Sequence, residues 1–294
     1  MANDDVFTAD IPFERSRFTR PAPGFRQQTN VVTAFLDASF VYGSDSARAV
    51  ALRAGVDGLL ATSAGNLLPF NTFGLTNDNP FGVPDASMMV GGDVRASENP
   101  GLLSLQTIFL REHNRRACEL KAANPGWDDF TLFEESRRWV IALVSNMVLY
   151  QWLPVVLDED PPAWTAYNPA GEPDIINYFS TAVFRYGHSQ INSDIVRLNA
   201  DGTPTAGGPL HLKESFFNAA KVVEEVYHGW LPTVWFVCLF VCLFVLFFLF
   251  YSEEKREGVP GDLGAFVCRD CVLWAPRLLD RLRAPSGLKH SHTQ

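Results

Sequence analysis

The sequence predicts a mainly α-helical fold with one further apolar helix near its C-terminus, and three observations support this. Apolar residues recur at intervals of three and four through 100–126, 131–157 and 173–188, which is the spacing of amphipathic helices. Alternating patterns of the kind that form strands are few. A continuous apolar run occupies 231–251, long enough for a helix that crosses a bilayer, which needs about 20 such residues.

The two longest helices are expected from residue 100 to about 126 and over 131–157. The sequence ANPG ends the first helix. In the second, Thr131 and Glu134 have the spacing of a capping box, and Pro154 should end or kink the helix. Its middle is apolar on nearly every side, which predicts a buried central helix. The apolar residues expected on one face of the first helix are Leu102, Leu105, Ile108, Phe109, Ala117 and Leu120.

Before residue 100 the pattern is mostly irregular. Residues 1–30 show no sustained period, and their acidic start lacks the apolar core of a signal peptide. A short helix is expected over 45–54, with Asp45 or Ser46 as its N-cap. Residues 55–92 are rich in Gly, Asn, Pro and Ser, which predicts a long loop over a helical core.

The apolar run has two competing explanations. Its length predicts a single-pass transmembrane helix, and hence a membrane location, with a loosely ordered tail over 252–294. However, every residue of 234–250 can be encoded by codons of T and G alone, and the repeated unit FVCL corresponds to a TTTG repeat. Such repeats are typical of non-coding DNA, so the run is either a membrane anchor or translated intron. The sequence leaves both open.

Charge and cysteine content narrow the function classes. The chain has 294 residues and a net charge of −9, which argues against nucleic acid as a partner. Its five cysteines form no disulfide framework. Cys268 and Cys271 make one CRDC pair, but a zinc site of this type needs a second pair of ligands.

Two short polar motifs flank the helical part of the chain. In GGDVRASENP, Arg95 and Glu98 stand three residues apart just before the first long helix, either as a surface ion pair or as polar groups of a buried site. In FRYGH, His188 ends an apolar helical segment, where an imidazole is either a core histidine or a metal ligand.

Four segments, in order, resemble the animal haem peroxidase family: TAFLDASFVYGS, GDVRASENPGLLSLQTIFLREHNR, WDDFTLFEESRRWVIALVSNMVLYQWLP and FRYGHSQI. The resemblance implies a partial haem peroxidase domain over 31–230, mainly helical and holding haem b. It also implies an activity, the oxidation of an electron donor by hydrogen peroxide.

The resemblance assigns roles to individual residues. His188 matches the proximal iron ligand, and Arg185 matches the residue that pairs with a haem propionate. Arg95 matches the distal arginine, a cation that stabilises the charge developing as the peroxide bond breaks. Glu98 matches the carboxylate that some members esterify to a haem methyl group.

A calcium loop is also implied. Thr33, Phe35, Asp37 and Ser39 match its residues, and alternate residues of an extended loop can turn their oxygens to one side, as a hard cation requires. An ordinary polar turn is the alternative.

The sequence departs from the family pattern in two places. The distal histidine motif should precede the calcium loop, yet no histidine precedes His113, and the family's C-terminal half has no match after about residue 228. We therefore expect an incomplete peroxidase, with one calcium ligand missing. The alternatives are a non-catalytic, membrane-tethered peroxidase-homology module that binds a partner, or a fragment from an incomplete gene prediction.

Overall fold

A computed structural model gives the fold of most of the chain before residue 228. The apolar run 231–251, the tail 252–294 and most of 1–30 lie outside the described residues. The described residues are 18–20, 24–161, 163–164, 166–199 and 201–227.

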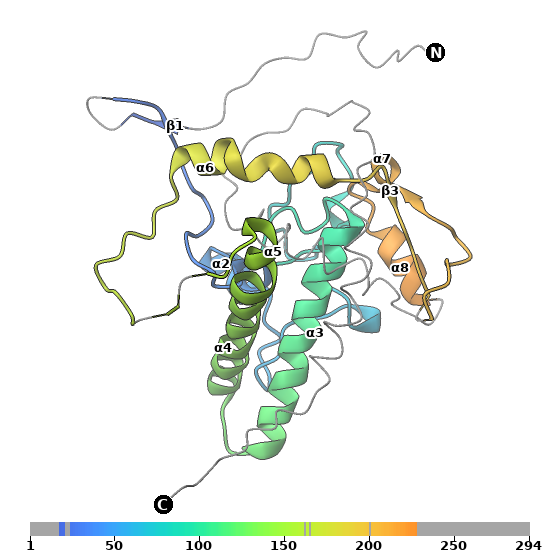
Figure 1. The fold of residues 1–294 in the computed structure, drawn as a ribbon. Coiled ribbons are helices and arrows are strands. Elements are labelled where there is room, and N and C mark those ends of the chain that lie inside the picture. Colours follow the sequence, from blue (N-terminus) through green and yellow to red (C-terminus); the bar gives the residue numbers. More distant parts are fainter. Residues whose placement is uncertain (1–17, 21–23, 162, 165, 200, 228–294) are drawn as a thin grey trace, which may run out of the picture.

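Two long helices, α3 (Pro100–Ala123) and α4 (Asp129–Met147), lie side by side and form the centre of the fold (Figure 1). The predicted boundaries of α3 are confirmed. Asn99 caps its N-terminus by accepting a hydrogen bond from the Leu102 backbone N–H at 3.0 Å, and Pro100 occupies the first turn, where its missing N–H costs nothing. Four residues of the expected face are buried: Leu102, Leu105, Phe109 and Ala117.

The prediction that the middle of α4 is fully buried is wrong. Only one stripe, which includes Val140, Val144 and Val148, is buried, while Trp139 and Tyr150 are exposed. Among the described residues α4 packs mainly against α3, so one face is covered and the other apolar face is not. The helical stretch Asp129–Leu157 is long and apolar enough to cross a membrane, which by itself is weak evidence that it does.

The N-terminal end of the α4 region differs from expectation, and at its other end the helix changes form just before Pro154. The N-cap is Asp128, whose carboxylate accepts from the Thr131 backbone N–H at 2.8 Å, so Thr131 is not the cap. Pro154 does not end the helix. A π-helical segment, η4 (Val148–Trp152), leads into α5 (Leu153–Leu157), and its wider turn accommodates the proline that lacks a backbone N–H.

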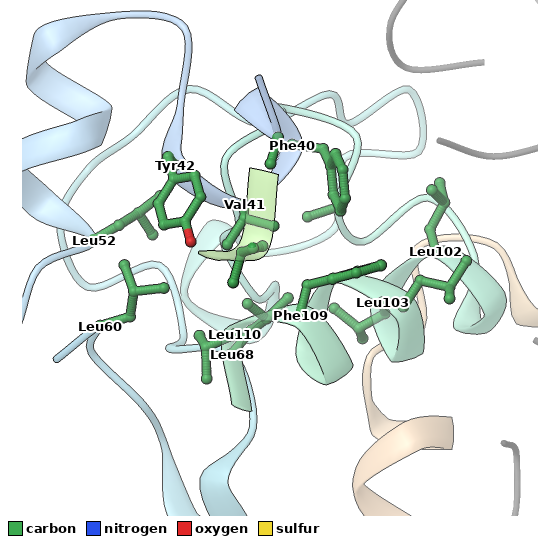
Figure 2. Packing of buried hydrophobic residues seen from close by; sticks show 14 of the residues in the cluster. Phe40, Val41, Tyr42, Leu52, Leu60, Leu68, Leu102, Leu103, Phe109 and Leu110 are labelled. Carbon is green, nitrogen blue, oxygen red and sulfur yellow. The ribbon is translucent and has the colours of Figure 1, made fainter. Parts of the chain in front are cut away.

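The segment before α3 wraps around it and supplies much of the core. Helix α1 (Ser39–Tyr42) and helix α2 (Ser46–Ala51) are joined to α3 by the predicted long loop, which contains the 3-10 turns η2 (Ala64–Asn66) and η3 (Asp85–Ser87). Asp45 caps α2, as predicted, by accepting from the Arg48 backbone N–H. Figure 2 shows the core between this segment and α3, with Phe40, Val41, Tyr42, Leu52, Leu60, Leu68, Leu102, Leu103, Phe109 and Leu110.

The segment after α5 forms short elements around the helical pair. The expected helix over 173–188 is instead two pieces, α6 (Asn177–Thr181) and the 3-10 helix η5 (Val183–Gln190), because Ala182 leaves the helical conformation. Strands β3 (Asp194–Ile195) and β4 (Leu210–His211) pair antiparallel.

The remaining elements are short. Helix α7 (Leu212–Ser215) follows β4, and α8 (Ala220–Tyr227) packs beside α3. Near the N-terminus, β1 (Phe18–Thr19) pairs antiparallel with β2 (Gln27–Gln28).

Candidate haem site

The turn that precedes α3 carries Arg95, and this arginine is buried. Its side chain is clamped by Asp93: Nε donates to Oδ1 at 2.9 Å and Nη2 donates to Oδ2 at 2.8 Å. The Arg95 backbone N–H donates to the same Oδ1 at 2.8 Å. Only 6% of Arg95 and 5% of Asp93 are exposed. A buried cation is stable only when it is paired and hydrogen-bonded, and this geometry meets both conditions.

The turn is attached to distant parts of the chain. The Gly92 N–H donates to the Phe40 carbonyl at 2.9 Å, and Arg48 Nη1 donates to the Gly91 carbonyl at 2.8 Å. The Ser97 hydroxyl donates to the Met89 carbonyl and accepts from the Met89 N–H. Position 92 must be glycine, because a Cβ there would lie 2.1 Å from the carbonyl oxygen of Ser39.

Glu98 is also buried, with 6% of the residue exposed. Its backbone carbonyl accepts a hydrogen bond from the Phe217 N–H at 2.9 Å, which brings the chain after α7 to the start of α3. The surface ion-pair interpretation of Arg95 and Glu98 is therefore wrong, since both residues lie inside the protein.

His188 and Arg185 lie on η5 and are half-buried. This element is fixed to the rest of the fold by aromatic packing: the Phe184 ring lies 6.4 Å from that of Trp152 at the end of η4, and 5.2 Å from that of Phe179. Together, α6 and η5 cross over the end of the helical pair at which α3 begins and α5 ends (Figure 1). The elements that carry His188 and Arg95 thus gather at one end of the fold.

The residues predicted to bind calcium form local turns. Asp37 Oδ1 accepts from the Ser39 N–H at 3.0 Å, and Thr33 Oγ1 accepts from the Phe35 N–H at 3.2 Å. Phe35 is exposed and Ser39 is buried at the start of α1. Within the described residues no three His, Cys, Asp or Glu side chains gather as metal ligands. The Ser39 end of this loop touches the Arg95 turn, because its carbonyl lies against Gly92.

His113 belongs to the core, which the sequence could not show. Its Nε2 lies 2.8 Å from the Gly58 carbonyl and its Nδ1 lies 2.9 Å from the Tyr42 hydroxyl. A carbonyl oxygen only accepts hydrogen bonds, so Nε2 carries the proton and Nδ1 accepts from the Tyr42 hydroxyl. Burial raises the pKa of Tyr42, which keeps this hydroxyl protonated. Burial lowers the pKa of His113 to about 4. Both partners are more than 50 residues away in sequence, so no local pattern marks this contact.

A pocket of about 880 Å³ lies elsewhere, between the long loop and the middle of α3. Its charged lining is already paired: Arg111 donates to the carbonyls of Gly65 and Asn66, and Glu112 accepts from Arg115 and Trp139. None of the sequence-predicted site residues lines this pocket.

The groups at the η5 end fit a haem. An imidazole at the end of a helical segment can ligate iron, and arginine guanidinium groups match propionate carboxylates or a peroxide-derived anion. The mainly helical fold and these donor groups are chemically compatible with the class of helical haem proteins.

Comparison with known proteins identifies the family. The sequence profile described as animal haem peroxidase matches residues 1–234. Peroxidasin of Drosophila melanogaster is 38% identical over 205 residues, and human myeloperoxidase is 38% identical over 235 residues. Peroxidase A of Dictyostelium discoideum has the same fold, with a TM-score of 0.61 at 30% identity. The chain belongs to the animal haem peroxidase family.

The chain spans only part of each relative. The match covers 65% of this chain and 13% of the Drosophila peroxidasin, and 73% of this chain and 31% of human myeloperoxidase. For peroxidase A it covers 64% of this chain and 37% of that protein.

Proposed function

We propose that this chain contributes a haem-binding peroxidase domain, in which hydrogen peroxide is consumed and an electron donor is oxidised. The observation that carries the proposal is Arg95. A guanidinium that is 6% exposed and held by two charged hydrogen bonds is a fixed cation, which is what a reaction that develops negative charge requires. Membership of the family supports haem b as the cofactor and peroxide as the oxidant.

The residues divide the work of holding haem. Bound haem supplies the redox-active iron at which peroxide is reduced. His188 would donate an imidazole nitrogen to that iron, and Arg185 would pair with a propionate. Glu98 would supply the carboxylate for an ester with a haem methyl group; that C–O bond replaces a methyl C–H bond, a two-electron oxidation that hydrogen peroxide would drive, with release of water. Arg95 then stabilises the anionic oxygen that leaves as the peroxide bond breaks.

Peroxide cleavage also needs a base that moves a proton from one oxygen to the other. His113 does not serve, because both of its ring nitrogens are engaged with Tyr42 and Gly58 and it remains neutral. His113 is therefore a structural residue of the core, and another group must supply the base.

A calcium ion is proposed at the loop formed by Thr33, Phe35, Asp37 and Ser39. Oxygen ligands from alternating residues suit a hard cation. The Asp37 carboxylate is already bound to the Ser39 N–H through one oxygen, so binding would use its other oxygen. Because Ser39 touches Gly92, an ion here would brace the turn that carries Arg95.

Location depends on the run 231–251. If the transcript retains these codons, their apolar length predicts a single-pass anchor that resists extraction with alkaline carbonate. Loss of the codons on splicing would remove the anchor from the proposal.

The test is haem reconstitution of the full chain. We expect a Soret band that His188→Ala removes, and a peroxide reaction, measured by stopped flow, that Arg95→Gln slows by about 100-fold. Arg53→Gln is the matched control, because it removes another arginine–aspartate pair, with Asp129, away from the proposed site. A His188→Ala chain that takes up haem with an unchanged spectrum would overturn the proximal assignment.

A further inference from the structure

Asp93 makes the most complete set of charged contacts at the proposed site, although no family motif or sequence argument above assigned it a role. Its two carboxylate oxygens accept three hydrogen bonds from Arg95, at 2.8, 2.9 and 2.8 Å. Both side chains are almost fully inaccessible, at 4% for Asp93 and 7% for Arg95. A two-point contact between a carboxylate and a guanidinium fixes the plane of the guanidinium as well as its position.

We propose that Asp93 is the positioning residue for Arg95, an inference that rests on the proposed peroxidase function. Asp93 holds the edge of the guanidinium formed by Nε and Nη2, so only the opposite edge, at Nη1, could be presented to peroxide. Electrostatic stabilisation is effective when the dipole or charge is already oriented before the reaction. An arginine side chain has many rotamers, and the clamp removes this freedom in advance.

Asp93 can hold Arg95 in place because the backbone around Asp93 is itself fixed by hydrogen bonds. The adjacent Gly92 N–H is bound to the Phe40 carbonyl at 2.9 Å, and the Val94 carbonyl accepts from the Asp78 N–H at 2.9 Å. The Asp93 carbonyl accepts from the Ala96 N–H at 3.2 Å, which closes the turn. These contacts come from separate parts of the chain, so the carboxylate is fixed relative to the core rather than to Arg95 alone.

Asp93 also makes burial of the arginine possible. A lone guanidinium in this position would draw water or turn outward, since an isolated buried charge is strongly unfavourable. The Asp93–Arg95 pair carries no net charge. Its effect on the site therefore comes from the fixed orientation of the guanidinium. Loss of Asp93 should therefore affect the peroxide rate rather than haem uptake.

The test uses the full chain loaded with haem. Asp93→Asn keeps the shape but cannot accept both charged hydrogen bonds, and we expect the second-order rate with peroxide to fall by about 10- to 100-fold at an unchanged Soret intensity. Asp129→Asn is the matched control, since it breaks the Arg53 pair elsewhere and should leave the rate unchanged. If Asp93→Asn does not fold, Asp93→Glu, which retains the carboxylate, replaces it, with a smaller loss expected.

Two further measurements separate positioning from a merely structural role. The double variant Asp93→Asn/Arg95→Gln should be no slower than Arg95→Gln alone, because Asp93 acts only through Arg95. Low millimolar guanidinium should partly restore the rate of Arg95→Ala but not of Asp93→Asn/Arg95→Ala, since the carboxylate holds the added cation.

The outcomes are distinct. A wild-type rate in Asp93→Asn or Asp93→Glu, additive losses in the double variant, or equal rescue with and without Asp93 would overturn the positioning role while leaving the proposed function intact. A wild-type chain that binds haem and shows no reaction with peroxide would instead overturn the proposed function, and the positioning role with it.

Discussion

The turn around Arg95 and the η5 segment that carries His188 are held in different ways. The Arg95 turn is buried and is joined to distant segments by backbone and side-chain hydrogen bonds, from Phe40 and Arg48 among others. The η5 segment is half-buried, and the ring of Phe184 packs against that of Trp152. Hydrogen bonds fix direction, whereas ring packing fixes only approximate position.

This difference indicates which part of the proposed site is already oriented before haem binds. The Arg95 side is oriented by contacts within the described residues. On the His188 side, an eight-residue 3-10 helix is longer than such helices usually are, because their hydrogen-bond geometry is poor. A ligand bond to His188 would add a further directional contact to this 3-10 segment, so haem binding should order η5 more than the Arg95 turn.

Gly92→Ala should have the largest effect on stability, because it disrupts the hydrogen-bonded Arg95 turn. The added Cβ would lie 2.1 Å from the Ser39 carbonyl oxygen and 2.6 Å from backbone atoms of Gly43 and Phe40, none of which can move independently. We expect a loss of about 3 kcal/mol or more in unfolding free energy, measured by urea denaturation. Gly126→Ala, where the added Cβ meets nothing within 4 Å, is the control and should change stability little.

Acid should weaken the folded core through His113, which contacts Tyr42 and Gly58. Burial lowers the pKa of His113 to about 4, so the unfolded chain, with an ordinary value near 6.5, takes up a proton more readily. The stabilisation is complete above pH 6.5 and is lost as the pH falls toward 4, by about 3 kcal/mol in all. Denaturation at a series of pH values measures this. His113→Gln should flatten the profile over that range, and an equally steep profile in this variant would show that other groups are responsible.

The sequence predicted what depends on local pattern. The bounds of α3 and the Asp45 cap were readable from spacing, and the family motifs pointed to Arg95, Glu98 and His188. Prediction from the sequence failed for features that depend on contacts between residues far apart in the chain. The exposed face of α4 is set by how few elements pack against it, and the roles of His113 and Asp93 come from Tyr42, Gly58 and the folded turn. The break at Ala182 likewise has no local sequence signal.

Phe184→Ala tests how the η5 segment that carries His188 is held. Its ring packs against Trp152, Phe179 and Tyr186, so its removal should loosen η5 without disturbing Arg95. Because the residue is only half-buried, we expect a loss of about 1–2 kcal/mol, less than for a fully buried phenylalanine. Hydrogen exchange should show faster exchange over 183–190 and unchanged protection over 91–99. Equal loss of protection in both segments would mean that the two sides are not held independently.

The smallest effect is expected at Gln106, beneath the Arg95 turn. Gln106 is 1% exposed, and neither end of its amide has a hydrogen-bond partner among the described residues. Its Oε1 lies against Gly91, where an added Cβ would approach it to 1.8 Å, so the side chain fills space below the turn without bonding to it. Methionine has a similar length and no polar atoms to desolvate. Gln106→Met should therefore leave the unfolding free energy unchanged or raise it by up to about 1 kcal/mol, whereas Gln106→Glu should lower it by burying an unpaired charge. A clear loss of stability in Gln106→Met would show that the amide has a bonded partner, such as an internal water, and that the Arg95 turn is supported from below as well as from Phe40 and Arg48.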